Sequence, residues 1–485
     1  MNSFISAINM TTTANGAIAH KGTGSRILDF FYHGATLRKN TDKALKLFKE
    51  AFYEDPTTAL RILFYIRDVR GGQGERAVFR ECLTWLAKEH PVWVLNNWYL
   101  IPEYGRWDDL IYIINDEDKL SDDLCIYLVA QLGEDIKRLK ANKDVSLLAK
   151  WMPSENASNP KTKAKAKLLM SKMGITPRRY RKALSTLRKY ISIVEHNLMK
   201  KEYTTIKYDS ISGKSLMKYR KAFHRNDEQR FTEAMEAAKS GKSKVNSGTL
   251  YPYEIVDKYI GTSWNWNLYT TEDASIEAMW NNLPDYVDDI NGLVVADTSG
   301  SMCGRPLHVS ISLALYIAER NKNDAFKNYF ITFDANPHLQ EVKGNSLRQR
   351  ISNLREINAW NTDLQKVFSL VLDRAIKCNV PVEDMPKTLI IVSDMQFDQA
   401  CKYNSSTNLE QIRERYKKAG YEMPKLVFWN VNSYDNVPAR MNDDGVLLLS
   451  GCSPVIMKYA IGEAFNPMQM VYKVTESERY KNIVF

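Results

Sequence analysis

Asp297, Ser299 and Ser301 form a group of oxygen ligands at the end of a predicted buried strand. They follow the apolar run at residues 293–296 in the order Asp-x-Ser-x-Ser. A carboxylate with nearby hydroxyls suits a hard cation such as Mg²⁺, which prefers oxygen ligands in octahedral geometry and keeps several waters. The sequence therefore predicts a divalent-cation site in this loop, for Mg²⁺ or for Mn²⁺ or Ca²⁺.

Two further segments carry matching side chains. Thr362 precedes a predicted helix at residues 364–377, and Asp394 follows a predicted strand at residues 388–392. Ligands of doubly wound sheets bind outside the carboxyl ends of the strands, so Thr362 and Asp394 are expected to converge on the cation near Asp297. The competing interpretation is that Asp297 and Thr362 only cap helices.

The second half of the chain has the pattern of an α/β domain with a doubly wound sheet. Apolar runs alternate with predicted helices at residues 307–320, 364–377 and 409–419. The runs lie at residues 292–296, 329–333, 388–392, 426–431 and 446–449. Strands that are apolar on both faces indicate a mostly parallel sheet covered by helices on both sides. Residues 338–343 are expected to add an antiparallel edge strand.

The first half has helical periodicity instead. Between about residues 41 and 261 apolar residues recur at the spacing of amphipathic helices, which glycine- and proline-containing turns separate. Short helices of this kind must stack to cover their apolar faces, which favours an all-α helical-repeat domain of the HEAT type. Since single cores stop growing at roughly 250 to 300 residues, we expect several domains in 485 residues. We place a helical domain at 1–270, a connecting helix or linker at 271–290 and the α/β domain at 291–485.

The positive charge of the chain points to a polyanionic partner. The formal net charge is +10, and residues 161–200 contain twelve lysines and arginines against the single acid Glu195. With tyrosines nearby as stacking surfaces, this segment is expected to contact RNA phosphates and unpaired bases; a solvated basic face is the alternative. The candidate contacts are Lys150, Lys163, Lys165, Lys167, Arg178, Arg179, Arg181, Lys182 and Arg188, with Arg67, Arg70 and Arg76 in the earlier helices.

Several other classes of protein lack their expected residues. Gly213-Lys214-Ser215 resembles part of a phosphate-binding loop, but Tyr208 occupies the position of its first glycine. The histidines and cysteines show no metal-binding or nucleophile spacing, and the glycines of residues 71–74 favour a tight turn between helices over a phosphate site. We therefore expect no enzyme. Residues 1–22 lack a signal sequence and no apolar run reaches 18 residues, so we expect a cytoplasmic protein without membrane contacts. We also expect a monomer.

The combination of Asp297, Ser299, Ser301, Thr362 and Asp394, in this order, resembles the metal-ion-dependent adhesion site of the von Willebrand factor type A domain. The resemblance implies that the three hydroxyls and two carboxylates bind one divalent cation directly or through water, and that one coordination position stays open for an acidic group of a partner. The chain departs from the family at Trp360 and Asn361, where glycines are common.

A helical half followed by such a domain is similar to the Ro autoantigen and its bacterial relatives, which carry the TROVE module. Residues 66–76 and 104–110 resemble the helix junctions of that family, whereas residues 150–154 and 393–398 resemble signatures of an uncharacterised bacterial, phage and plant family with the same layout. The Ro-like resemblance implies a helical ring that binds structured noncoding RNA outside and single-stranded ends of misfolded RNA in its cavity. The alternative function is a protein-interaction adaptor that captures an acidic partner through the metal site.

Overall fold

The computed structural model describes residues 9–191, 193–260, 271–287, 291–333, 336–354, 363–397, 408–432, 436–460 and 465–485. Its first part is helical and its second part contains a sheet. The helices of the first part are α2 (Arg26–Gly34), α3 (Thr41–Glu54), α4 (Pro56–Arg67), α5 (Ala77–Glu89), α6 (Pro91–Asn96), α7 (Leu100–Tyr104), α8 (Trp107–Ile113), α9 (Lys119–Lys140), α10 (Leu148–Trp151), α11 (Pro160–Lys172), α12 (Pro177–Tyr190), α13 (Val194–Lys200), α14 (Gly213–Asn226), α15 (Glu228–Lys239), α16 (Pro252–Val256) and α17 (Ala274–Asn281).

Local sequence signals set where several of these helices begin. The Asp55 carboxylate accepts a hydrogen bond from the Thr58 amide over 3.1 Å, and Pro56 occupies the first helical position of α4. Asn159 caps α11 in the same way, again followed by proline. A capping side chain satisfies an amide that the helix itself cannot, and proline has no amide to lose there. These pairs therefore define the turns between successive helices.

The second part is built on one six-stranded sheet. Its strands are β3 (Gly292–Asp297), β4 (Tyr329–Phe333), β5 (Leu339–Glu341), β6 (Thr388–Ser393), β7 (Lys425–Asn430) and β8 (Val446–Ser450). They lie in the order β5-β4-β3-β6-β7-β8, and all neighbours run parallel except the β4–β5 pair. The accompanying helices are α18 (Arg305–Arg320), α19 (Leu347–Asn353), α20 (Leu364–Cys378), α21 (Asn408–Ala419), α22 (Met457–Ala460) and α23 (Pro467–Thr475).

The sequence-based expectations for this sheet are confirmed. The five apolar runs are β3, β4, β6, β7 and β8, and the predicted antiparallel edge strand is β5. The strands are buried along almost their whole length, so both faces of the sheet are covered. Consecutive parallel strands must be joined by crossovers, and α18, α20 and α21 lie in the crossovers that follow β3, β4 and β6. Within the described residues, β7 reaches β8 without a helix.

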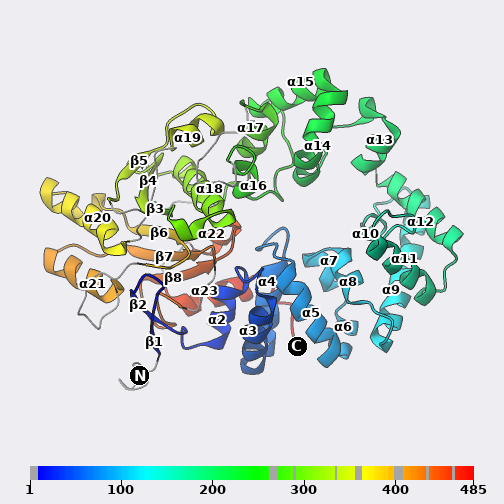
Figure 1. Cartoon of the computed structure of the whole chain (residues 1–485), viewed down its shortest axis with the longest axis horizontal. Coiled ribbons are helices and arrows are strands. Elements are labelled where there is room, and N and C mark those ends of the chain that lie inside the picture. Colours follow the sequence, from blue (N-terminus) through cyan, green and yellow to red (C-terminus); the bar gives the residue numbers. More distant parts are fainter. Residues whose placement is uncertain are drawn as a thin grey trace.

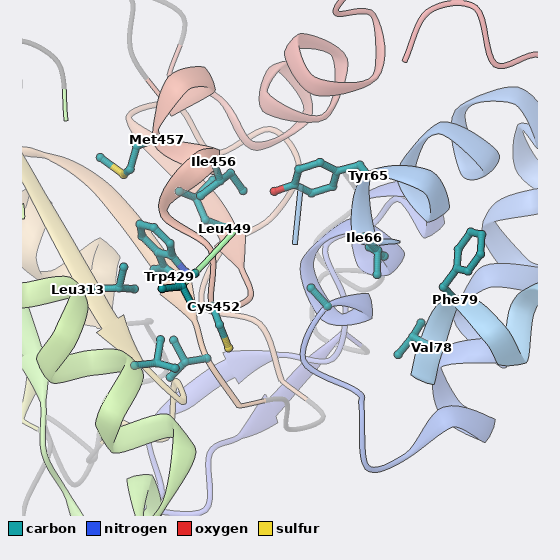
Figure 2. Close-up of a cluster of buried hydrophobic side chains, with 14 of the residues drawn as sticks. Tyr65, Ile66, Val78, Phe79, Leu313, Trp429, Leu449, Cys452, Ile456 and Met457 are labelled. Atoms are coloured by element: carbon teal, nitrogen blue, oxygen red, sulfur yellow. The ribbon is translucent and has the colours of Figure 1, made fainter. Parts of the chain in front are cut away.

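The helical part curves into a ring whose two ends meet the α/β part (Figure 1). At one end α16 packs on α18, and at the other α2 packs on β8 and α4 packs on α23. The Ser450 hydroxyl donates to the Phe31 carbonyl over 3.1 Å across the second junction. Buried side chains of both parts belong to one continuous core, in which Tyr65 of α4 faces Ile456 and Leu449 of the α/β part (Figure 2). Apolar packing therefore contributes to the closure of the ring, together with polar bonds across the junctions.

A short β-hairpin at the start of the described chain was not predicted. Its strands are β1 (Met10–Thr12) and β2 (Ile18–His20), and their register pairs Thr11 with Ala19. Three-residue strands carry too little periodicity to stand out in a sequence. The hairpin packs on the α/β part, because His20 and Val437 exchange backbone hydrogen bonds of 3.1 and 2.9 Å.

The glycine-rich segment at residues 71–74 is a tight turn, as predicted. The amides of Gln73, Gly74 and Glu75 donate to backbone carbonyls of residues 65–68 over 2.8 to 3.1 Å, so they are not directed at a phosphate. Gly74 has a φ of +64°, and a Cβ there would overlap the Tyr251 hydroxyl.

In the parts of the chain that the structure describes, no helix is both long and apolar enough to cross a membrane.

Candidate metal centre and ring cavity

The topology of the sheet brings the two predicted carboxylate ligands together. Asp297 ends β3 and Asp394 directly follows β6, and these strands are parallel neighbours with Ala296 opposite Val392. Both carboxylates are completely buried. The Ser393 hydroxyl donates to Asp297 Oδ2 over 2.5 Å, and the Ser299 amide donates to Asp297 Oδ1 over 2.9 Å.

The hydroxyls of the same loop complete a group of oxygen ligands. Ser299 Oγ and Ser301 Oγ are 3.2 Å apart. The Ser301 side chain partly offsets the rise in the pKa of Asp394 that burial causes. Asp297, Ser299, Ser301 and Asp394 are therefore gathered at one edge of the sheet, as predicted. Thr362, the fifth predicted ligand, and the neighbouring Trp360 lie outside the described residues.

The electrostatics of this group fit a cation. Burial, together with the charge of Asp394, raises the pKa of Asp297 to about 7, and burial raises the pKa of Asp394 as well. Asp394 Oδ2 is buried without a hydrogen-bond partner. Two buried carboxylates that repel each other, one of them with an unsatisfied oxygen, cost free energy unless a positive charge lies between them. Within the described residues no cluster of three or more His, Cys, Asp or Glu side chains occurs.

The inner face of the ring holds a separate cavity of about 720 Å³. It is lined by α7, α8, α10, α14 and the segments around Arg70 and Tyr251. The four helices lie around the centre of the ring in Figure 1. The described basic side chains in its wall are Arg70, Arg106, Lys150, Lys214 and Lys218. The described acidic ones are Glu103 and Glu195. The wall therefore carries an excess of positive charge.

Aromatic rings alternate with these cations. Arg106 lies over the Trp151 ring at 4.7 Å, and Lys214 lies over the Tyr251 ring at 4.8 Å. Trp98 and Trp107 also line the cavity, with their rings 5.9 Å apart. Positive groups beside flat apolar surfaces are the combination that binds single-stranded nucleic acid, because the cations attract phosphates and the rings stack on bases.

Two of the predicted RNA contacts, Arg70 and Lys150, line this cavity. Others lie on α11 and α12 at the periphery of the ring (Figure 1). Lys163, Lys167, Arg178, Arg179, Arg181 and Lys182 are exposed there. Arg181 pairs with Glu155 over 2.5 Å. Arg76 is also exposed and lies 3.8 Å from Asp108. The basic candidates thus fall on two surfaces, an outer face and the cavity.

Three of the predicted contacts bond to the protein itself. Arg67 is 1% exposed and forms an ion pair of 2.6 Å with the buried Asp109, so it supports the helix junction. Lys165 donates to the carbonyls at the end of α8, including that of Ile114. Arg188 donates to the carbonyls of residues 149 and 152 over 2.8 and 2.6 Å. A sequence shows where basic residues are but not which of them the fold uses for its own carbonyls and carboxylates.

Sequence reasoning also missed three cavity residues, Arg106, Lys214 and Lys218. They are far apart in the sequence and lie outside the dense basic segment, so charge density could not identify them. The only signal was Gly213-Lys214-Ser215, which is not a phosphate-binding loop but the first turn of α14. Burial lowers the pKa of Lys214, which pairs with Glu254.

Comparisons with known proteins place the chain in a family. The model described as domain of unknown function (DUF2828) matches residues 13–124 and 119–292, and the model described as domain of unknown function (DUF7788) matches residues 291–482. The uncharacterized protein L728 of Acanthamoeba polyphaga mimivirus is 30% identical over 510 residues, covering 96% of this chain and 87% of that protein. The crystal structure of the Deinococcus radiodurans Ro (RSR) protein aligns with 92% of each chain at 11% identity, with a TM-score of 0.34. The family model covers more than half of the chain and the viral relative spans nearly all of it, so the chain belongs to the DUF2828 family.

Proposed function

We propose that this protein is a Ro-like RNA-binding protein in which a single-stranded RNA segment occupies the ring cavity. The observation that carries the proposal is the wall of that cavity, where Arg70, Arg106 and Lys150 alternate with tryptophans. The exposed cations of α11 and α12 would hold structured RNA outside the ring. The helices would form HEAT-like repeats, and the α/β part would be a von Willebrand factor type A domain. The protein acts in this proposal by binding, as a scaffold or quality-control factor for noncoding or misfolded RNA, and not by catalysis.

Contacts between basic side chains and RNA phosphates make the binding affinity depend on salt concentration, so the proposal can be tested by measuring that dependence. For single strands, the slope of log K against log salt changes by roughly 0.7 for each phosphate contact. Exchange of Lys150 and Lys218 for glutamate should therefore weaken binding of an unstructured RNA oligonucleotide at least tenfold and flatten the salt dependence. The measurement is fluorescence anisotropy of a labelled oligonucleotide at several salt concentrations, with EDTA present.

A matched control and a second pair of sites separate the two basic surfaces. Lys417→Glu with Lys418→Glu changes the same number of charges on the exposed face of α21 and should leave affinity unchanged. Arg178→Glu with Arg179→Glu should weaken binding of structured RNA more than of the unstructured oligonucleotide. If the Lys150 and Lys218 variant binds the oligonucleotide as well as the control, the cavity is not the RNA site.

For the α/β part we propose a metal-ion-dependent adhesion site of the kind found in von Willebrand factor type A domains. Asp297, Ser299, Ser301 and Asp394 would hold Mg²⁺ or another hard divalent cation. The ion would neutralise the two carboxylates and could accept an oxygen ligand from outside. The unpartnered Oδ2 of Asp394 is the observation that supports it.

This site also supports the second candidate function, an adaptor that grips an acidic partner protein through the ion. Under that function Asp297→Ala or EDTA should abolish partner capture, and RNA affinity should be negligible. Under the first function RNA affinity survives both treatments. Sequencing of RNA that crosslinks to the purified full chain, with the Asp297→Ala variant in parallel, distinguishes the two.

A further inference from the structure

The hairpin of β1 and β2 holds the loop that carries Asp394. Its turn makes three hydrogen bonds to that loop, each bridging more than 380 positions of sequence. The Ala14 amide donates to Gln396 Oε1 over 2.7 Å, and Asn15 Nδ2 donates to the Gln396 carbonyl over 2.8 Å. The Thr13 hydroxyl donates to the Phe397 carbonyl over 2.6 Å. The hairpin is thus bonded to the two residues that follow Asp394 and Met395.

Gln396 connects the hairpin to the carboxylate itself. The backbone amide of Gln396 donates to Asp394 Oδ1 over 3.1 Å, which leaves Asp394 Oδ2 as the oxygen without a partner. The Gln396 side chain is 3% exposed. Its Nε2 donates to Asn436 Oδ1 over 2.7 Å, and Asn436 Nδ2 donates to the Met395 carbonyl over 3.2 Å. One buried amide side chain therefore bonds the hairpin on one side and the segment after β7 on the other.

The backbone between Asp394 and Gln396 needs this support. Met395 has a φ of +64°, a conformation that side-chain-bearing residues adopt only when their surroundings enforce it. The Met395 amide donates to Ser393 Oγ over 3.0 Å, and the same hydroxyl donates to Asp297. A change in the loop would therefore move Asp394 and disturb the bond to Asp297 at the same time.

We propose that Thr13, Asn15 and Gln396 are positioning residues of the metal site, which hold Asp394 in the orientation that a hard divalent cation requires. This inference rests on the metal site proposed above. Residues that orient metal ligands through hydrogen bonds commonly alter metal affinity by about 10- to 100-fold when they are changed. Binding is also reciprocal, so the cation should strengthen the docking of the hairpin by the same factor.

The test is calorimetric titration of the full chain with Mn²⁺ alone. The double variant Thr13→Ala, Asn15→Ala and the single variant Gln396→Ala should each bind Mn²⁺ about tenfold more weakly than the natural chain. Thr12→Ala, an exposed residue of the same hairpin, is the matched control and should not change the affinity. Circular dichroism and thermal unfolding in EDTA show whether each variant is folded at the titration temperature.

The outcomes separate this inference from the proposed metal site. If the natural chain binds Mn²⁺ and Asp297→Ala does not, the metal site stands. If the hairpin variants then melt at a lower temperature but bind Mn²⁺ as tightly as the natural chain, the hairpin is only structural and the inference is wrong. If the natural chain binds no Mn²⁺, the metal site and the positioning role both fall, while the RNA proposal is unaffected. A reciprocal readout supports the inference if Mn²⁺ slows limited proteolysis of the hairpin in the natural chain but not in Asp297→Ala.

Discussion

Asp68 and Arg479 are 411 positions apart in the sequence, and Arg479 Nη2 donates to Asp68 Oδ1 over 2.8 Å. Asp68 is completely buried at the end of α4, and its other oxygen accepts the Tyr480 hydroxyl over 2.8 Å. The segment after α23 continues along the first helices, where Trp93 Nε1 donates to the Val484 carbonyl over 2.8 Å. This ion pair therefore lies where the chain closes the ring.

Asp68→Asn should loosen this closure. Removing one charge of a buried pair costs about 3 to 5 kcal/mol, and because the Arg479 side chain is 31% exposed, we expect about 2 to 3 kcal/mol. Denaturant unfolding measures the loss, and limited proteolysis should cut residues 476–485 faster. Lys481→Ala removes only an exposed pair with Glu478 and should cost no more than about 0.5 kcal/mol. Equal stability of the two variants would show that the ion pair does not hold the ring closed.

The buried His33 should make the fold sensitive to acid. Burial, with the charge of Lys43, lowers the pKa of His33 to about 3. Below its ordinary value of 6.5, therefore, only the unfolded chain takes up the proton, and stability falls as the pH falls. One such group accounts for about 1.4 kcal/mol per pH unit.

His33→Gln should remove this part of the pH dependence. Between pH 6.5 and 5 the natural chain should lose about 2 kcal/mol more than the variant, measured by denaturant unfolding at each pH. His224→Gln, at a position whose side chain is 60% exposed, is the control and should keep the slope of the natural chain. Parallel pH profiles for the natural chain and the His33 variant would contradict the assignment.

The sheet and the adjacent carboxylates of Asp297 and Asp394 could be predicted because their signals are local. Each parallel strand is a short apolar run, and the residue after it must lie at the carboxyl edge, so the adjacency of Asp297 and Asp394 follows from the pattern. The hairpin at residues 10–20 could not be predicted in this way, since its partner, the loop at Gln396, is distant in sequence. The ion pair of Arg67 with Asp109 could not be predicted either, because the fold brings these two helix junctions together and the sequence alone does not show their contact.

The residues that line the cavity could not be predicted from the sequence either. Charge density in the sequence is highest in α11 and α12, yet none of their described residues lines the cavity. Its cations come one or two at a time from four separate segments, and only ring closure brings them together. A site assembled by topology in this way leaves no local motif.

Metal binding should be detectable as a thermal shift. The unneutralised carboxylates of Asp297 and Asp394 destabilise the metal-free fold, because burial and mutual repulsion raise the pKa of Asp297. If the proposed site binds Mg²⁺, the ion at about one hundred times its Kd should add ~2.7 kcal/mol to the stability of the folded state. Asp297→Asn should be at least as stable as the natural chain in EDTA and should not respond to Mg²⁺. The measurement is differential scanning fluorimetry with EDTA or Mg²⁺; a Mg²⁺ response that survives in Asp297→Asn would place the ion elsewhere.

Trp151 should contribute to RNA binding by stacking and not by charge. It lines the cavity beside Arg106, and stacking of a base on an aromatic side chain contributes about 1 to 3 kcal/mol. Trp151→Ala should therefore weaken binding of an unstructured oligonucleotide by about 5- to 150-fold, without changing the slope of its salt dependence, whereas Trp151→Phe should retain part of the affinity. Tyr53→Ala, an aromatic residue that is 76% exposed on α3 outside the cavity, is the control. Binding of the Trp151→Ala variant at the level of this control would mean that no base stacks there, and a flattened salt dependence would mean that Trp151 acts only by placing Arg106.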